Sequence, residues 1–301
     1  MKKLSFIIIF IAACSIHGHT QRIDLDIFGG LSNYQGDLQP IFLTLKQSKP
    51  AGFIVVKYGI NEKIFLRAGF AIGSLEGSDK INRVDLVNRN LSFKTKLSEF
   101  HAGVEYRFIN PENFSLSPYV FAGVGVYHYN PYATYQGKQY FLQPLGTEGQ
   151  GLAQYPDKKI YSLNQLCLPY GGGFKWQVNC NLNIGFEFGH RKLFTDYLDD
   201  VSGTFADENV LRNTRGQIAV DLAFRRKEVD PNKPYPTEGA GRGNPKQDDW
   251  YYFTGFNIGL RLNDCETGGF SLGGLFKGRG NGFGGGGRRG KSRTSCPTNV
   301  W

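Results

Sequence analysis

The feature that most constrains this chain is a series of segments in which apolar and polar residues alternate strictly. Segment 63–73 shows the pattern, with Arg67 on one face and an apolar series on the other: Ile64, Leu66, Ala68, Phe70 and Ile72. A charge on the inner face of a dry core is costly, but it is tolerated where the interior is polar and the outer face meets lipid. Strict alternation with inward charges therefore predicts a transmembrane β-barrel.

Eight such segments are expected, at 22–30, 52–60, 63–73, 92–108, 117–129, 161–176, 181–191 and 250–262. Three of their connections are tight turns, and four are long, at 31–51, 74–91, 130–160 and 192–249. Short turns at one end and long loops at the other are typical of outer-membrane barrels, and an even strand count leaves both termini in the periplasm. The predicted fold class is all-β, an eight-stranded antiparallel transmembrane β-barrel with long outer loops.

The composition fits this class. The 301 residues include 40 glycines, 24 phenylalanines and 16 tyrosines but a single methionine, as suits curved strands with aromatic girdles. Residues 1–20 read as a signal peptide, because Lys2 and Lys3 precede an apolar stretch too short to span a bilayer as a helix. The rest divides into the barrel, 21–263, and a glycine-rich basic tail, 264–301, expected to be disordered.

Five cysteines are few for an exported chain and do not indicate a disulfide scaffold. Cys14 follows a sequence that resembles a lipoprotein cleavage box and is a candidate for lipidation, with ordinary cleavage near Gly18 or Thr20 as the alternative. Cys265 and Cys296 lie in the tail and are a candidate disulfide in an oxidising periplasm. Much of the net charge of +9 also lies in the tail. Because the chain is expected to be exported, this basic run favours contact with anionic headgroups or an acidic protein over nucleic acid, and a solvated tail is favoured further.

Charges of both signs recur on the inward faces of the predicted strands. The expected set is Asp24, Asp26, Lys57, Arg67, His101, Glu105, Arg107, Lys175, Glu187, Arg191 and Arg261. Side chains just fill the interior of an eight-stranded barrel. We therefore expect these groups to pair with one another and close the lumen rather than conduct ions. The structural network is predicted to centre on Arg67, Glu105, Arg107, Glu187 and Arg191.

Two segments leave alternatives open. Segment 93–97 has the opposite parity to the rest of its strand, which indicates a bulge near Ser98 or an extension beyond the membrane. Segment 217–224 alternates like a ninth strand, yet Asp207 is a plausible N-cap, and 207–224 also reads as a helix broken near Gly216. Because bacterial single-chain barrels have even strand counts, we favour the helix.

No residue pattern points to an enzyme, a metal site or a cofactor. The histidines outside the leader do not select a catalytic triad or a metal-ligand spacing: His101, His128 and His190. Three acidic residues give a weak indication of Ca²⁺ binding: Asp196, Asp199 and Asp200. Since they lack the spacing of a calcium loop, we expect them in a solvated loop.

Several strings resemble a known family of exported barrels. They are FGGLSNYQGD at 28–37, LQPLGTEGQGL at 142–152, YSLNQL at 161–166, RKLFTDYLDDVS at 191–202, RGNPK at 242–246 and DWY at 249–251. On these strings, residues 22–263 resemble the PorG-like outer-membrane β-barrel family, which is associated with the type IX secretion system. The basic tail departs from the family pattern, and nothing about its role carries over.

The resemblance implies a non-enzymatic structural or interaction component of type IX protein secretion and of the gliding apparatus that shares its parts. The implied partners are outer-membrane lipid and the periplasmic ring proteins of that machine, with no nucleic acid and no cofactor. The implied location is the outer membrane of a Gram-negative bacterium, with both termini in the periplasm. The alternatives are a surface barrel whose outer loops bind an extracellular ligand and a lipid hydrolase acting at the rim.

Overall fold

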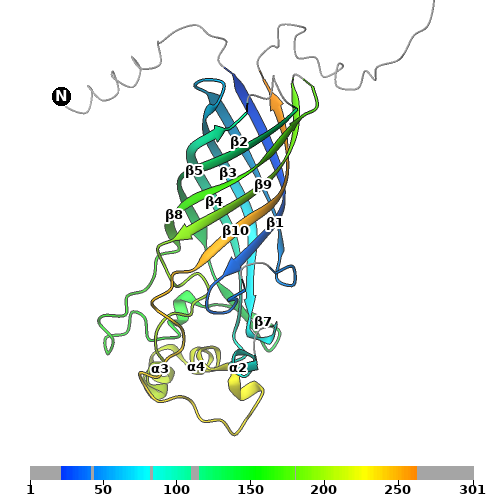
Figure 1. Ribbon diagram of the computed structural model, residues 1–301. Helices are drawn as coiled ribbons and strands as arrows, with labels where there is room; N and C mark the ends of the chain where they lie inside the picture. Colours follow the sequence, from blue (N-terminus) through cyan, green and yellow to red (C-terminus); the bar gives the residue numbers. More distant parts are fainter. Residues whose placement is uncertain (1–21, 42–43, 82–83, 110–114, 180, 263–301) are drawn as a thin grey trace, which may run out of the picture.

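Eight long strands form the main body of the computed structural model, which describes residues 22–41, 44–81, 84–109, 115–179 and 181–262 (Figure 1). They are β1 (Ile23–Gln35), β2 (Lys49–Gly59), β3 (Ile64–Ser78), β4 (Ser92–Arg107), β5 (Leu116–Tyr129), β8 (Asn164–Gln177), β9 (Leu182–Leu193) and β10 (Trp250–Arg261). Each pairs antiparallel with the next of these strands, and β1 pairs with β10 to close the barrel. The predicted all-β, eight-stranded class is confirmed.

The two ends of the barrel differ in their connections. β1 begins and β10 ends at one end, here called the terminal end, and the long loops gather at the other, the loop end (Figure 1). Two turns at the terminal end are closed by asparagines, whose side chains commonly satisfy backbone groups in turns. The Asn61 side chain accepts a hydrogen bond from the Ile64 N–H at 2.8 Å, and Asn179 accepts one from the Leu182 N–H at 2.9 Å.

Several strands continue past their predicted ends. β3 reaches Ser78, and β4 pairs with it without interruption until Ser92 lies opposite Ser78. Of the two alternatives for segment 93–97, the structure contains the extension and not the bulge near Ser98, because β4 continues past the apolar part of the wall with its register unchanged. Only the chemistry of the two faces changes along it: Phe93 and Leu97 are buried inside, and polar side chains point outward.

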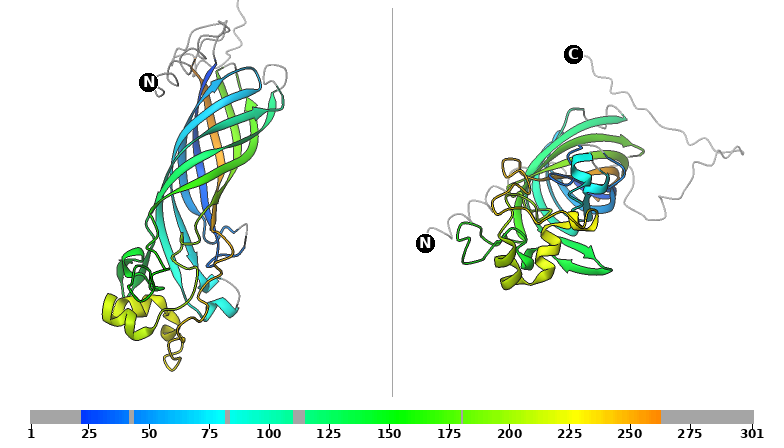
Figure 2. Two further views of the ribbon diagram at one scale, coloured as in Figure 1. Left: turned by 90° about the vertical axis from the view of Figure 1, so that its left-hand side faces the viewer. Right: turned by 90° about the horizontal axis from the view of Figure 1, so that it is seen from below.

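The long loops carry the remaining elements. They are η1 (Asp79–Ile81), α2 (Val84–Val87), β6 (Tyr132–Tyr135), β7 (Lys138–Phe141), η2 (Gln143–Leu145), α3 (Glu208–Arg215), α4 (Gln217–Ala223) and η3 (Arg225–Glu228). Segment 217–224 is mostly helical, as favoured above. Asp207 caps α3 by accepting from the Val210 N–H at 2.9 Å, and Gly216, with a φ of 87°, separates α3 from α4. Figure 2 shows both helices beyond the loop end of the barrel.

Apolar side chains form a band around the outside of the barrel. Twelve examples are 44–67% exposed: Ile54, Leu66, Phe70, Ile72, Phe100, Val124, Leu166, Phe174, Trp176, Ile184, Phe256 and Ile258. On β8 the band runs from Leu166 to Trp176. At about 3.3 Å per residue and a tilt of about 40°, this is about 25 Å high, which matches the lipid-facing band of transmembrane barrels. Among the described residues, no helix has the length and apolar character needed to cross a membrane.

A charge in the middle of this band should prevent assembly in a membrane. Leu66→Arg and Ile184→Arg each put a cation on the exposed apolar face, at a cost of about 2–4 kcal/mol near the bilayer midplane. The control Ala71→Ser alters the buried inward face and should assemble normally. Heat-modifiable gel migration of the membrane fraction measures assembly. Arginine variants that assemble as well as the serine variant would show that the facing assignment is wrong.

Candidate functional site

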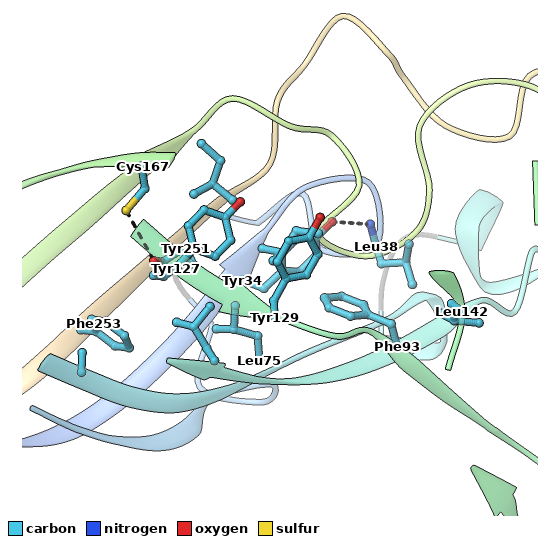
Figure 3. Packing of buried hydrophobic residues seen from close by; sticks show 14 of the residues in the cluster. Tyr34, Leu38, Leu75, Phe93, Tyr127, Tyr129, Leu142, Cys167, Tyr251 and Phe253 are labelled. Carbon is cyan, nitrogen blue, oxygen red and sulfur yellow. Dashed lines mark hydrogen bonds between the residues drawn. The ribbon is translucent and has the colours of Figure 1, made fainter. Parts of the chain in front are cut away.

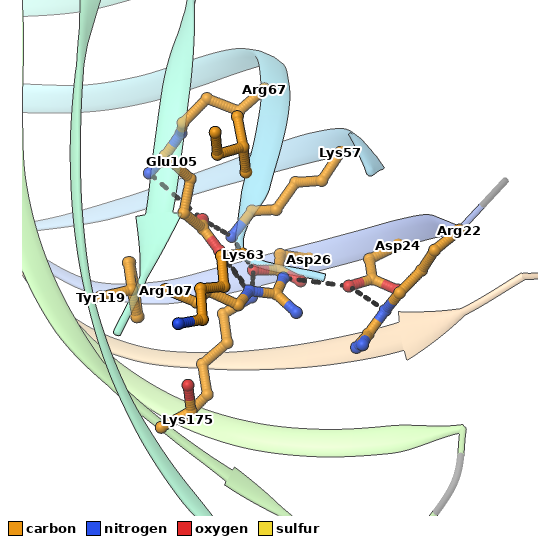
Figure 4. A network of polar contacts seen from close by, with 12 residues as sticks. Arg22, Asp24, Asp26, Lys57, Lys63, Arg67, Glu105, Arg107, Tyr119 and Lys175 are labelled. Carbon is orange, nitrogen blue, oxygen red and sulfur yellow. Dashed lines mark hydrogen bonds and ion pairs between the residues drawn. The ribbon is translucent and has the colours of Figure 1, made fainter. Parts of the chain in front are cut away.

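Charged side chains fill the terminal end of the barrel (Figure 4). Arg22 pairs with Asp24 at 2.9 Å and is partly exposed at the edge of this group. The fully buried members are four carboxylates and four cations, so their formal charges balance, and all eight are at most 3% exposed: Asp24, Asp26, Glu105 and Glu187 with Lys57, Arg67, Arg107 and Lys175. We call these eight residues the lumen network. Because a buried charge is tolerated only when it is paired, the balance of signs allows this polar interior to exist.

Glu105 on β4 is the centre of the lumen network. Its Oε1 accepts from Arg107 Nε at 2.9 Å and lies 3.7 Å from Lys175 Nζ. Its Oε2 binds Lys57 Nζ and lies 3.8 Å from Arg67 Nη1. Each cation also contacts a second carboxylate: Lys57 and Lys175 contact Asp26 at 2.6 and 2.9 Å, Arg67 contacts Glu187 at 3.0 Å, and Arg107 contacts Asp24 at 3.0 Å.

Aromatic rings line the spaces between these charges. The Arg107 guanidinium lies 3.6 Å from the centre of the Phe65 ring, and the Arg67 guanidinium lies 3.8 Å from the centre of Phe121. The Tyr119 hydroxyl donates to Glu187 Oε2 at 2.7 Å. Cation–π contacts of this kind are strengthened by the absence of competing water, so the rings hold the cations in place as well as filling volume.

A second ionic group lies closer to the loop end. Arg191 Nε and the Tyr251 hydroxyl donate to Glu99 Oε2 at 3.0 and 2.6 Å, and His101 Nδ1 lies 2.8 Å from Glu99 Oε1. Glu99 is missing from the predicted inward set, although it has the same parity as Glu105. Arg261, which was also predicted to point inward, is only partly buried at the end of β10.

Aromatic side chains fill the barrel near its loop end (Figure 3). Six of them are at most 1% exposed: Tyr34, Phe93, Tyr127, Tyr129, Tyr251 and Phe253. Tyr34 meets Phe93 edge-on with ring centres 4.8 Å apart, and Tyr127 stacks on Tyr129 at 5.4 Å. Cys167 is buried beside Tyr251 and forms no disulfide within the described part of the chain.

The long loops fold together into a cap, defined as the described residues of 36–48, 79–91, 130–163 and 194–249. Tyr34, at the end of β1, holds two cap carboxyls: its hydroxyl lies 2.5 Å from Asp199 Oδ2 and 3.0 Å from Asp249 Oδ1. A phenol has one hydrogen to donate, so the two buried carboxyls share it and lie close to each other. Burial and the neighbouring carboxylates raise the pKa of both Asp199 and Asp249 well above the usual range.

Arg242 links two other loops of the cap. Its Nη1 donates to Glu148 Oε1 at 3.0 Å and to the backbone oxygen of Asp200 at 2.5 Å. The Glu148 carboxylate also accepts from the backbone N–H groups of Ser202 and Gly203, each at 2.9 Å. Arg242 and Glu148 are both nearly fully buried. Removing Arg242 would leave the Glu148 carboxylate buried without its cationic partner.

The acidic segment 196–200 is buried, so the expected solvated loop is wrong. Asp196, Asp199 and Asp200 are 8%, 1% and 0% exposed. Burial raises the pKa of Asp200 to about 6 in spite of the nearby Arg242, and it raises the pKa of Asp196 to about 8. No three His, Cys, Asp or Glu side chains in the described ranges are placed to hold a metal ion.

The strings that carry the family resemblance meet in this cap. Each supplies at least one partner to its polar core: Tyr34 and Asp37 from 28–37, Thr147 and Glu148 from 142–152, Tyr161 from 161–166, Asp199 and Asp200 from 191–202, Arg242 and Asn244 from 242–246, and Asp249 from 249–251. Segments up to about 200 residues apart in the chain therefore complete one hydrogen-bonded core.

Residues 1–220 match a family model described as a domain of unknown function, DUF6089. The chain belongs to this family. The match ends within α4, so Arg242, Asp249 and β10 lie beyond it. No curated protein matches the chain.

Several solved structures are similar in fold to this DUF6089 member. Neisserial surface protein A is 9% identical, with 79% of this chain and 96% of that chain covered and a TM-score of 0.40. Ail of Yersinia pestis, in a complex with sucrose octasulfate, is 13% identical, with coverages of 81% and 99% and a TM-score of 0.39. A major outer-membrane protein of Thermus thermophilus is 12% identical, with coverages of 81% and 100% and a TM-score of 0.38.

Removing the central charge of the lumen network should destabilise the barrel strongly. Glu105→Gln leaves cations facing one another without their shared carboxylate, and breaking a buried pair in this way costs about 3–5 kcal/mol. Glu76→Gln is the matched control, because Glu76 pairs with Lys49 and Lys94 on the outer surface. Urea unfolding in detergent measures the difference. Equal stability of the two variants would contradict the role of the network.

The cap should lose stability as the pH rises from about 4 to about 8. The folded pKa of Asp196 is about 8 and the unfolded value is about 3.9, so the folded state binds this proton more tightly and is weakened as the proton is lost. Asp196→Asn should therefore stabilise the cap by about 2 kcal/mol at pH 8, after allowance for solvent screening, and leave it unchanged at pH 4. Protease resistance of the cap at both pH values measures this, with the exposed Asp157→Asn as control. An equal effect at both pH values would rule out titration of Asp196.

Proposed function

We propose that this DUF6089 protein is an integral outer-membrane barrel that performs no catalysis and acts as a structural and interaction component. The observation that most supports an outer-membrane barrel is an outward apolar band about 25 Å high around a filled interior of paired charges. A closed sheet with this polarity satisfies all of its backbone groups within itself, which a lipid environment demands. The terminal end faces the periplasm in this proposal, and the cap faces the exterior.

The chemistry of the interior supports a role without catalysis. The lumen carboxylates are each held by lysine or arginine, as Glu105 and Glu187 illustrate. A carboxylate engaged by cations is a weak base, and a general base needs a free path to its substrate. His101 lies inside the barrel beside Glu99 and is 3% exposed, which also disfavours an acid–base role.

The proposed machine is the type IX secretion system and the gliding apparatus that shares its parts. This proposal is supported by the resemblance of the strings at 142–152 and 191–202 to PorG-like barrels. The two strings also hydrogen-bond to each other in the core of the cap. In this role the barrel anchors periplasmic ring proteins from the outer membrane. The basic tail, which follows β10, is proposed as a contact site for them, because its charge suits an acidic protein surface.

A second candidate function is recognition of an extracellular ligand by the cap. The observation that favours it is the fixed shape of the cap, which has an apolar cluster of its own: Leu152, Leu211, Ala219, Val220 and Ala223. Loops that served only to connect strands would not need a core. In this reading the cap is the binding surface and the barrel is its anchor.

Co-purification from detergent-solubilised outer membrane tests the two candidates. Periplasmic ring proteins should be recovered with the full chain, and deletion of residues 268–301 should reduce their recovery without removing a strand, since β10 ends at Arg261. Arg242→Gln should loosen the cap and leave their recovery unchanged. Recovery that is unaffected by the deletion would overturn the proposed contact site. Recovery of an extracellular ligand that depends on Arg242 would favour the second candidate.

A further inference from the structure

A groove of about 550 Å³ lies on the wall of the barrel toward the loop end, over β2, β3, β4 and β5. The strand register explains why the wall is recessed there. Ile72 lies between Gly52 and Ser98 on the neighbouring strands, and His128 is opposite Ser98 on the next strand. Gly52 and Ser98 are small and lie beside the larger Ile72 and His128, so the outer surface is hollowed at this level.

The groove lies where the wall changes from apolar to polar. Two positions along each strand toward the barrel centre, the same four strands present an unbroken row of exposed apolar side chains: Ile54, Phe70, Phe100 and Val126. Two residues closer to the loop end, Ser74 lies opposite Lys96. The apolar row belongs to the lipid-facing band, so the groove lies at the level of the lipid headgroups on the cap side.

The polar side of the groove is basic. Lys96 is exposed, lines the groove and forms no ion pair with any residue in the described ranges. One row closer to the loop end, Lys94 lies opposite Glu76, and the single Glu76 carboxylate pairs with both Lys94 and Lys49, at 3.2 and 2.9 Å. Cations therefore exceed anions around the groove, and no carboxylate of the described residues lines it. His128 adds a ring nitrogen that is 2.9 Å from Asn164 Oδ1.

We propose that this groove binds one phosphorylated lipid of the outer leaflet. The lipid phosphate lies against Lys96 and the Ser98 and Ser74 hydroxyls, and the acyl chains lie along the row containing Phe70 and Phe100. Lysine and hydroxyl groups are common phosphate ligands, and a volume of about 550 Å³ suffices for a headgroup. The inference rests on the proposed outer-membrane location, since the apolar row contacts acyl chains only in a membrane.

Native mass spectrometry of the full chain in detergent micelles tests this, with bisphosphorylated lipid A as the probe. The wild type should retain one lipid A molecule. Lys96→Gln should lower its affinity about fivefold, equivalent to about 1 kcal/mol for one interfacial lysine. Ser98→Leu should fill the hollow and weaken binding further. The matched control is Lys192→Gln, which removes an exposed lysine near the loop end of β9, away from the groove.

Two further comparisons define the ligand. Dephosphorylated lipid A lacks the group that Lys96 binds. Its affinity for the wild type should therefore be as low as the affinity of lipid A for the Lys96→Gln variant. Added inorganic phosphate should not displace the lipid, and displacement would show that a free anion site is present instead. Equal retention of lipid A by the Lys96→Gln and Lys192→Gln variants would also overturn the proposal.

Separate measurements test the lipid site and the outer-membrane location on which it rests. Heat-modifiable migration and outer-membrane fractionation are recorded for each variant before lipid binding is measured. A wild-type chain absent from the outer membrane would contradict the proposed function. A wild-type chain that is present there and retains no more lipid A than Ser98→Leu would contradict the groove alone.

Discussion

Glu105 lies among four cationic side chains inside a barrel too narrow to hydrate them. Desolvating so many charges costs free energy that their attraction only partly recovers, so the network is better understood as a source of specificity than of stability. A shift of one residue in any strand would turn its inward charges toward the lipid. With four carboxylates matched to four cations, few other registers keep every charge buried and paired.

The same constraint organises the rest of the molecule. Alternation places the apolar band outside, and charges and then aromatic rings fill the interior toward the loop end. Beyond the rings, Tyr34 extends the packed interior into the cap by contacting Asp199 and Asp249. The cap therefore continues the interior of the barrel, and its loops are fixed by the strand ends. A headgroup groove forms on the outer wall where small outward residues such as Gly52 and Ser98 interrupt the band.

Local patterns predicted the barrel because its signals lie within single strands. The alternation around Arg67, the turn at Asn61 and the helix break at Gly216 are all local, and the structure contains each of them. Parity alone also indicated that Glu105 and Glu187 point inward. At Ser98 the sequence could not distinguish a bulge from an extended strand, because a change in polarity there could also be read as a change in register. In β4 the inner face becomes apolar past the band while the pairing with β3 continues unchanged.

The core of the cap was beyond local reasoning because its pairs join distant loops. Asp200 looks like a solvated loop residue until Arg242, which is 42 positions away, reaches its backbone. The sequence signal for the cap was a set of long strings that resemble a known family, and the resemblance gave no physical reason for their composition. Conductance in planar bilayers tests the central claim, that paired charges and rings close the barrel. The account predicts no stable open channel for the purified wild-type protein. Reproducible conductance with a defined ion selectivity would contradict it.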